Sequence, residues 1–197
     1  VYGFTYILAR FINYFFISLY TRVLDTGEYG IYSEIMAYVV LLQVVLTFGL
    51  ETGFFRFANR TDQDPKLVYS TILRFLLFTS LTFFAIAFLL ADSIADLMGY
   101  AKIAIIYIAA ILAIDSFTSV MFAKLRHDSK AWKFGLFKMI KILSESAFNL
   151  IFFLLLPKYF AAYPDSFLLN FIPAKPDYTY IFAAIFCSGI VSLLLFI

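Results

Sequence analysis

The sequence predicts an all-α, polytopic transmembrane helical bundle with six spans. Of the 197 residues, 63% are hydrophobic and 14% are charged, whereas soluble domains are nearer half apolar and a quarter charged. The apolar residues also fall into separate runs of about 20, the length that a helix needs to cross a bilayer. A soluble domain of this size cannot bury so much apolar surface, so this surface is expected to face lipid.

The first three spans are expected at residues 2–24, 30–56 and 67–91. The first two are apolar and aromatic runs on either side of a short turn that contains acidic residues and glycines. A polar link ending in an Asp-Pro turn separates the second run from the third. The third run is nearly free of charge, and a short acidic link follows it.

The last three spans are expected at residues 101–123, 132–156 and 178–197. The link between the fourth and fifth runs is the most polar stretch of the chain. Pro157 is expected to stop the fifth helix, because proline lacks the backbone N–H that a helix interior requires. A link with four prolines precedes the sixth run, which continues to the last residue. We therefore expect a single transmembrane lobe that is truncated at its C-terminus.

The basic residues near the helix ends predict the orientation in the membrane. Lys and Arg concentrate beside the second-to-third and fourth-to-fifth links, while the other side carries fewer of them and more acids. Cytoplasmic loops are enriched in Lys and Arg, so the N-terminus is expected to be cytoplasmic. The residues concerned are Arg56, Arg60, Lys66, Arg74, Lys124, Arg126, Lys130 and Lys133.

Composition and motifs exclude several classes of function. The net charge of +2 is too small to favour nucleic acid as a partner. No phosphate-binding loop is present. The one histidine, His127, and the one cysteine, Cys187, lie in different regions, so no catalytic or metal-ligating set can be assembled from them. We therefore expect no cofactor, no metal and no enzymatic activity.

The fifth expected helix carries a polar stripe on one face. Its four members are spaced i, i+3, i+7 and i+11, which places them together at 3.6 residues per turn. A cationic stripe in a membrane helix suits a water-filled cavity for an anionic substrate. The alternative is an ion pair between the second and third members plus a lysine that reaches the interface. The stripe consists of Lys138, Lys141, Glu145 and Asn149.

Further polar residues stand where hydrocarbon should exclude them. Arg10 and Asn13 begin a second stripe on the first helix. Arg10 suits phosphate oxygens or pairs with an acid. Asp115 lies midway along the fourth helix, where it is a candidate site for a coupling ion or a counter-charge for Arg10 or a stripe lysine. Glu34 and Glu51 on the second helix are the other coupling-ion candidates, for a proton or sodium.

Three segments carry a family resemblance. They are LARFINYFFISLYTRVLDTGEYGIY at 8–32, TFGLETGFFRF at 47–57 and the basic link LRHDSKAWKFG at 125–135. In these the chain resembles the polysaccharide-export flippases, whose superfamily also holds multidrug antiporters and the lipid II flippase. The resemblance implies the N-terminal lobe of a two-lobe flippase in the inner (plasma) membrane of a bacterium. Arg10 then corresponds to a cationic position of the family's cavity.

The resemblance also implies a substrate. It would be a polyprenyl-diphosphate-linked oligosaccharide, carried from the inner to the outer leaflet by alternating access. Tyr14 stands where the lipid II flippase has a second arginine, which favours an O-antigen, capsule or exopolysaccharide repeat unit. A cation-coupled drug or metabolite antiporter of the same superfamily is the main alternative. A membrane-embedded glycosyl- or prenyltransferase and a structural membrane subunit are weaker ones.

Overall fold

The computed structural model describes residues 2–60, 63–163 and 166–196, with side chains for all of these except residues 2, 4–6, 9 and 13. Within these residues the chain is helical with no strand, as the sequence predicts. The helices are α1 (Tyr2–Val23), α2 (Thr26–Thr47), α3 (Leu50–Ala58), α4 (Pro65–Leu89), α5 (Ala91–Met98), α6 (Lys102–His127), α7 (Ala131–Leu150), α8 (Leu156–Ala162) and α9 (Tyr178–Leu194), with a π-helical segment, η1 (Ile151–Leu155), and a 3₁₀ turn, η2 (Phe167–Asn170).

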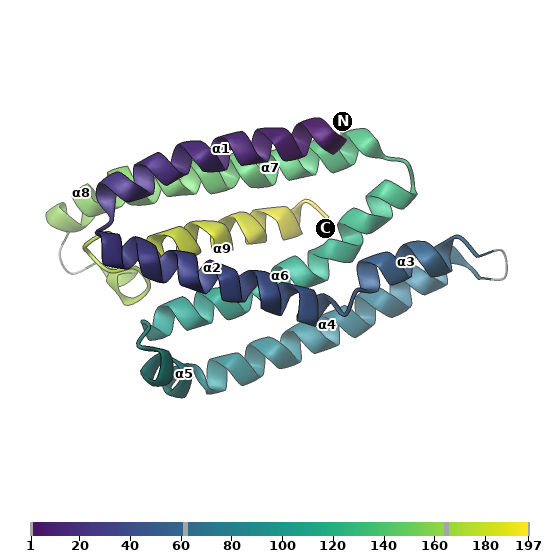
Figure 1. The fold of residues 1–197 in the computed structure, drawn as a ribbon, viewed down its shortest axis with the longest axis horizontal. Helices are drawn as coiled ribbons and strands as arrows, with labels where there is room; N and C mark the ends of the chain where they lie inside the picture. The colour runs from purple at the N-terminus through teal and green to yellow at the C-terminus, as the bar shows by residue number, and fades with distance from the viewer. Residues whose placement is uncertain (1, 61–62, 164–165, 197) are drawn as a thin grey trace.

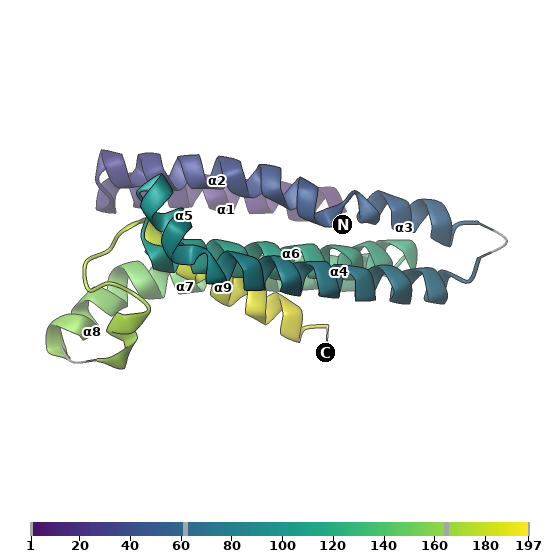
Figure 2. The same ribbon diagram turned by 90° about the horizontal axis from the view of Figure 1, so that it is seen from below.

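The long helices form two layers that run roughly along one direction (Figure 1). Figure 2 shows α1, α2 and α3 in one layer and α4, α6, α7 and α9 in the other. Helix α6 is the centre of the bundle, because it contacts α2, α3, α4, α5, α7 and α9. Half of its most apolar stretch is buried inside the protein, compared with 11–17% for the other long apolar helices.

Four helical segments are long and apolar enough to span a membrane within the described ranges: Thr26–Ala58, Pro65–Leu89, Lys102–His127 and Ala131–Ala162. They leave many large apolar side chains exposed, including Leu89 at 80%. Surfaces of this kind belong in lipid, so the chain is a membrane protein. Helix α9 is apolar but shorter, and α1 is not among the four. The count of six spans therefore stays a prediction.

The second helix differs from the single helix expected over residues 30–56. It begins earlier, at Thr26, and breaks after Thr47. Phe48 and Gly49 both adopt left-handed backbone conformations, with φ of 50° and 63°. Two such residues in succession end a right-handed helix. Helix α3 restarts at Leu50 with a new direction (Figure 1).

Pro157 does not end the fifth span, contrary to the prediction. The chain continues from α7 through η1 into α8, where Pro157 is one of the first residues. Proline in a helix clashes with the carbonyl four residues earlier, here that of Phe153. Phe153 lies in the π-helical segment, whose wider turn shifts the hydrogen-bond register. The helix can therefore accept the proline.

The remaining boundaries differ by a few residues from those expected. Helix α4 covers Pro65–Leu89 instead of 67–91, and α6 continues to His127 instead of ending near 123. The acidic link after the third span is itself a short helix, α5, which ends at Met98 and is capped by Gly99 with φ of 70°. Helix α9 ends at Leu194.

Candidate functional site: a polar cavity between α2, α3, α6 and α7

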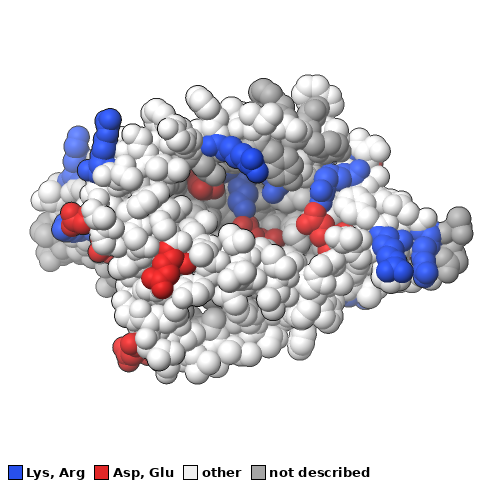
Figure 3. Space-filling view, in the orientation of Figure 1, with Lys and Arg blue, Asp and Glu red and all other residues white. Residues whose placement is uncertain are grey.

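A polar cavity of about 210 Å³ lies where α2 and α3 face α6 and α7. In Figure 3, acidic and basic side chains gather in and around a central hollow on the face shown, and much of the surface around them is uncharged. A charged group in a membrane bundle almost always faces the interior or a water-filled space. The residues lining the cavity are Gln43, Glu51, Asp115, Thr118, Ser119, Phe122, Arg126, Phe134, Lys138 and Lys141.

An ion pair joins α6 and α7 across the cavity. Lys141 Nζ donates a hydrogen bond of 2.6 Å to Asp115 Oδ1, and the two side chains are only 16% and 32% exposed. Asp115 thus serves as the counter-charge of a stripe lysine, one of the two partners weighed from the sequence. Lys141 therefore pairs across to α6 and not with Glu145 on its own helix, which was the alternative to a cavity-lining stripe.

A second ion pair joins α3 to the end of α6. The Arg126 guanidinium donates to Glu51 Oε1. The same guanidinium lies over the rings of Phe55 and Phe134, at 5.3 and 5.8 Å from their centroids, where it gains cation–π attraction. The break at Gly49 sets the direction of α3 and so places Glu51 opposite Arg126.

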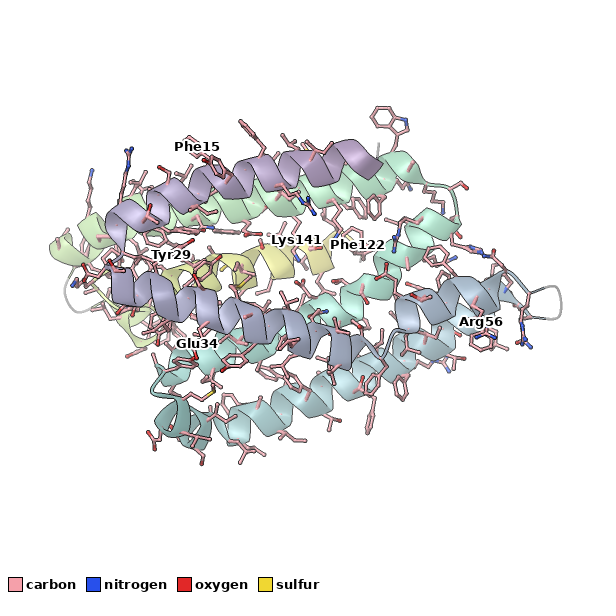
Figure 4. All side chains as sticks on the ribbon, viewed as in Figure 1. Phe15, Tyr29, Glu34, Arg56, Phe122 and Lys141 are labelled. Carbon is pink, nitrogen blue, oxygen red and sulfur yellow. The ribbon has the colours of Figure 1, made fainter. Side chains whose placement is uncertain are left out.

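Lys138 lies in the cavity and forms no salt bridge with a carboxylate in the part of the chain described. Its Nζ is 4.2 Å from the centroid of the Phe122 ring, and no salt bridge within 4 Å joins it to a described acid. Figure 4 shows Phe122 and Lys141 in the central space between α6 and α7. The lining residues include three cations and two anions, so the cavity carries a formal charge of +1.

Two of the four residues in the polar stripe of α7 are among the residues that line the cavity. Lys138 and Lys141 line the cavity, whereas Glu145 and Asn149 are not among its lining residues. Asn149 is 1% exposed. Its Oδ1 accepts a hydrogen bond of 2.9 Å from the Tyr20 hydroxyl, and its Nδ2 donates to the Glu145 carbonyl at 3.0 Å. Asn149 therefore ties α7 to α1 inside the helix core.

Three other candidates are not among the residues described as lining this cavity. Arg10 is exposed on α1 and is not a described lining residue. Glu34 is also exposed, and its Oε1 accepts a long hydrogen bond of 3.5 Å from Tyr38. Figure 4 places Glu34 on the opposite side of α2 from Lys141. Asn13 has a side chain outside the described set.

Arg126 and Gln43 are among the lining residues that were not singled out from the sequence as site residues. Arg126 looked like one of several basic residues in a cytoplasmic link, and nothing local shows that it pairs with a residue 75 positions earlier. Gln43 offered a signal, because it is the lone amide in a long apolar run. In the structure its Nε2 donates a hydrogen bond of 3.1 Å to Ser116 Oγ on α6.

Comparison with known proteins identifies the family. Residues 19–170 match the family model described as a polysaccharide biosynthesis protein. The matched region extends from the end of α1 to η2 and contains every residue that lines the cavity. No curated protein and no solved structure is significantly similar. Because the match covers more than half of the chain, the protein belongs to this family of polysaccharide biosynthesis proteins.

Proposed function

We propose that the protein is a flippase that carries a polyprenyl-diphosphate-linked oligosaccharide from the inner to the outer leaflet of a bacterial inner membrane. The observation that carries this proposal is the net positive cavity inside an apolar helical bundle. A diphosphate crossing the membrane needs compensating cations, because an unpaired charge in hydrocarbon is costly. The repeat unit of an O-antigen, capsule or exopolysaccharide suits the family's role in polysaccharide biosynthesis.

Lys138 is the residue to which we assign the diphosphate. Lys141 and Arg126 are already paired with Asp115 and Glu51. Lys138 interacts with an aromatic face, an interaction of about 0.5–2 kcal/mol. A phosphate oxygen offers a stronger, charge-assisted hydrogen bond. The lysine can therefore exchange the ring for substrate without breaking an ion pair.

A flippase moves its substrate without making or breaking a covalent bond, so we propose no enzymatic step and no cofactor. The basic ends of α3 and α6 would face the cytoplasm, where the headgroup enters, and the bundle would act as one lobe rocking against another. A cation-coupled antiporter is less well supported by the cavity. It would require an acid free to bind a proton or sodium, and both acids in the cavity are engaged by basic side chains.

The test is the Lys138→Gln substitution in the natural protein, in cells that depend on it for surface polysaccharide. Losing one charge-assisted hydrogen bond of about 1.5–3 kcal/mol should lower transport by about tenfold or more. Surface polysaccharide should fall while lipid-linked oligosaccharide accumulates in the inner leaflet. Lys138→Arg should retain transport, because it keeps the charge.

The matched control is Lys133→Gln, which removes an exposed lysine from the same helix. It should leave surface polysaccharide unchanged. Protein in the membrane must be equal for all variants, as measured by immunoblot. Normal surface polysaccharide with Lys138→Gln at equal expression would refute the assignment of the diphosphate to this cavity.

A further inference from the structure

An apolar groove of about 490 Å³ lies between α2, α4, α5 and α6. Its walls are aliphatic and aromatic, and no charged residue lines it among those described. The groove lies at the edge of the bundle where α4 and α5 are seen in Figure 1, away from α1 and α7. In a membrane this edge faces hydrocarbon.

The groove and the polar cavity lie end to end along the same pair of helices. On α2 the groove ends at Leu42 and the cavity begins at Gln43. On α6 the groove ends at Leu112 and the cavity begins at Asp115. The hydrogen bond between Gln43 and Ser116 lies at this junction. The path between α2 and α6 is therefore amphipathic, with a polar half and an apolar half.

We propose that the groove holds the hydrocarbon tail of the lipid whose anionic headgroup lies beside Lys138. This proposal rests on the proposed function and adds a place for the tail. The order of the two sites matches a lipid of the inner leaflet. The headgroup lies toward the ends of α3 and α6 that carry Arg56, Lys124 and Arg126, and the tail extends toward α5. Positive residues are enriched on the cytoplasmic side.

The groove is expected to position the tail more than to increase affinity. A tail that leaves the bilayer for the groove exchanges one apolar environment for another, so the gain comes from close packing and not from leaving water. The charged cavity supplies the selection for an anionic head. A tail held in the groove would then fix where along α2 and α6 that head can reach.

The experiment uses photo-crosslinking on the purified natural protein in lipid nanodiscs. The probe is geranylgeranyl diphosphate with a diazirine near the end of its tail. Two further probes carry the same diazirine: the alcohol without the diphosphate, and phosphatidylethanolamine. Mass spectrometry locates the labelled peptides. We expect the diphosphate probe to label groove residues of α2, α4 and α6 several-fold more than the other two probes do.

A matched pair of substitutions on α4 tests the groove directly. Ala87 lines the groove, and Ala85, two residues earlier, is exposed outside it. Ala87→Trp should fill the groove and reduce its labelling several-fold, whereas Ala85→Trp should leave the labelling unchanged. Both place a tryptophan on a lipid-facing helix, so a general effect on folding would appear in both.

The outcomes separate this proposal from the proposed function. Labelling that depends on Lys138 but falls outside the groove would overturn the tail site and leave the headgroup site standing. Equal labelling of the groove by all three probes would mean bulk lipid in the groove and would overturn the tail site. An unlabelled groove would mean that another protein segment covers it, and this result would also overturn the tail site. Groove labelling by the diphosphate probe that is unaffected by Lys138→Gln would refute the headgroup assignment instead.

Discussion

The two halves of the α2–α6 interface differ in how they handle polarity. The half nearer α5 is an apolar groove. The half nearer α3 holds five charged side chains, of which four form two ion pairs. The same two helices make both walls, so the change occurs within about one turn, between Leu42 and Gln43 on α2 and between Leu112 and Asp115 on α6.

The difference shows what keeps a charged cavity stable in a membrane protein. The groove needs only apolar side chains that tolerate lipid. The cavity needs each charge compensated, because a buried ion without a partner costs several kcal/mol. Pairing across helices meets that need and links α3, α6 and α7. Among the described lining residues, the charge outside these two pairs is that of Lys138, to which we assign the diphosphate.

The largest effect is expected from breaking the pair between Asp115 and Lys141. Asp115→Asn leaves the Lys141 ammonium, 16% exposed, without its carboxylate. The expected cost is about 3 kcal/mol of unfolding free energy, near the lower end for a broken buried pair because Asp115 is partly exposed. The measurement is thermal unfolding in detergent. No comparable cost is expected from Ala85→Trp at the lipid-facing surface.

A double variant distinguishes a lost pair from a local packing defect. Asp115→Asn combined with Lys141→Met removes both charges and should recover most of the lost stability, giving a large coupling energy in the double-mutant cycle. If the two single substitutions are additive, the pair does not stabilise the cavity.

The sequence alone predicts the charged residues that α7 contributes to the polar cavity. It predicts few of the lining residues on α2, α3 and α6. The 3.6-residue period placed Lys138 and Lys141 on one face, because that pattern depends only on local helix geometry. The sequence offers both Arg10 and a stripe lysine as partners for Asp115, and only the packing of α6 against α7 decides between them. Arg126 and Glu51 come together from helices far apart in the chain, which no local pattern reveals.

The fold shows the same division between local and tertiary information. Hydropathy predicts an all-α membrane bundle, because apolar helices in lipid satisfy their own backbone hydrogen bonds. The break at Phe48 is not predictable by propensity, since phenylalanine rarely adopts positive φ. At Pro157 the sequence predicts a helix end that the structure does not have, because a π-helical turn accommodates the proline. The stripe residue Asn149 contacts the core through Tyr20, a contact that depends on how α1 packs.

A smaller effect is expected from altering the break between α2 and α3. Gly49 has a φ of 63°, and an added Cβ would meet no atom within 4 Å, so Gly49→Ala should cost only the left-handed conformational penalty of about 1–2 kcal/mol. The measurement is again the unfolding midpoint. Because the break aims α3 at Arg126, this change should also weaken the contact between Glu51 and Arg126 in the cavity.

Gly53 provides the control for this prediction. It lies inside α3, and its Cβ would also meet open space. Gly53→Ala should stabilise the helix by about 0.5–1 kcal/mol, because alanine has the higher helix propensity. Equal effects of the two substitutions would mean that the conformation at Gly49 contributes nothing to the position of α3.

The smallest effect is expected in the loop after α6, outside both regions. Lys124 Nζ lies 3.1 Å from Asp128 Oδ1, and His127 and Lys130 are within 3.5 Å. Burial raises the pKa of Asp128, but the hydrogen bonds from these three residues outweigh it and lower the pKa below its ordinary value. Asp128→Asn should therefore cost less than about 1 kcal/mol at neutral pH, as surface pairs do.

The pH dependence of that cost separates the pair in the loop after α6 from the pair between α6 and α7 at Asp115. Because the folded pKa of Asp128 is lowered, its contribution is fully present above the unfolded value near pH 4 and disappears as the pH falls through the folded pKa. The difference between the unfolding midpoints of Asp128→Asn and the unchanged protein should therefore disappear in acid. High salt should reduce the same difference by a smaller amount, because it screens the ion pair. Asp92→Asn, whose carboxylate is 73% exposed beside Lys102, should show no measurable change at any pH. If Asp128→Asn at neutral pH costs as much as Asp115→Asn, burial within the bundle is not what makes the cavity pair strong.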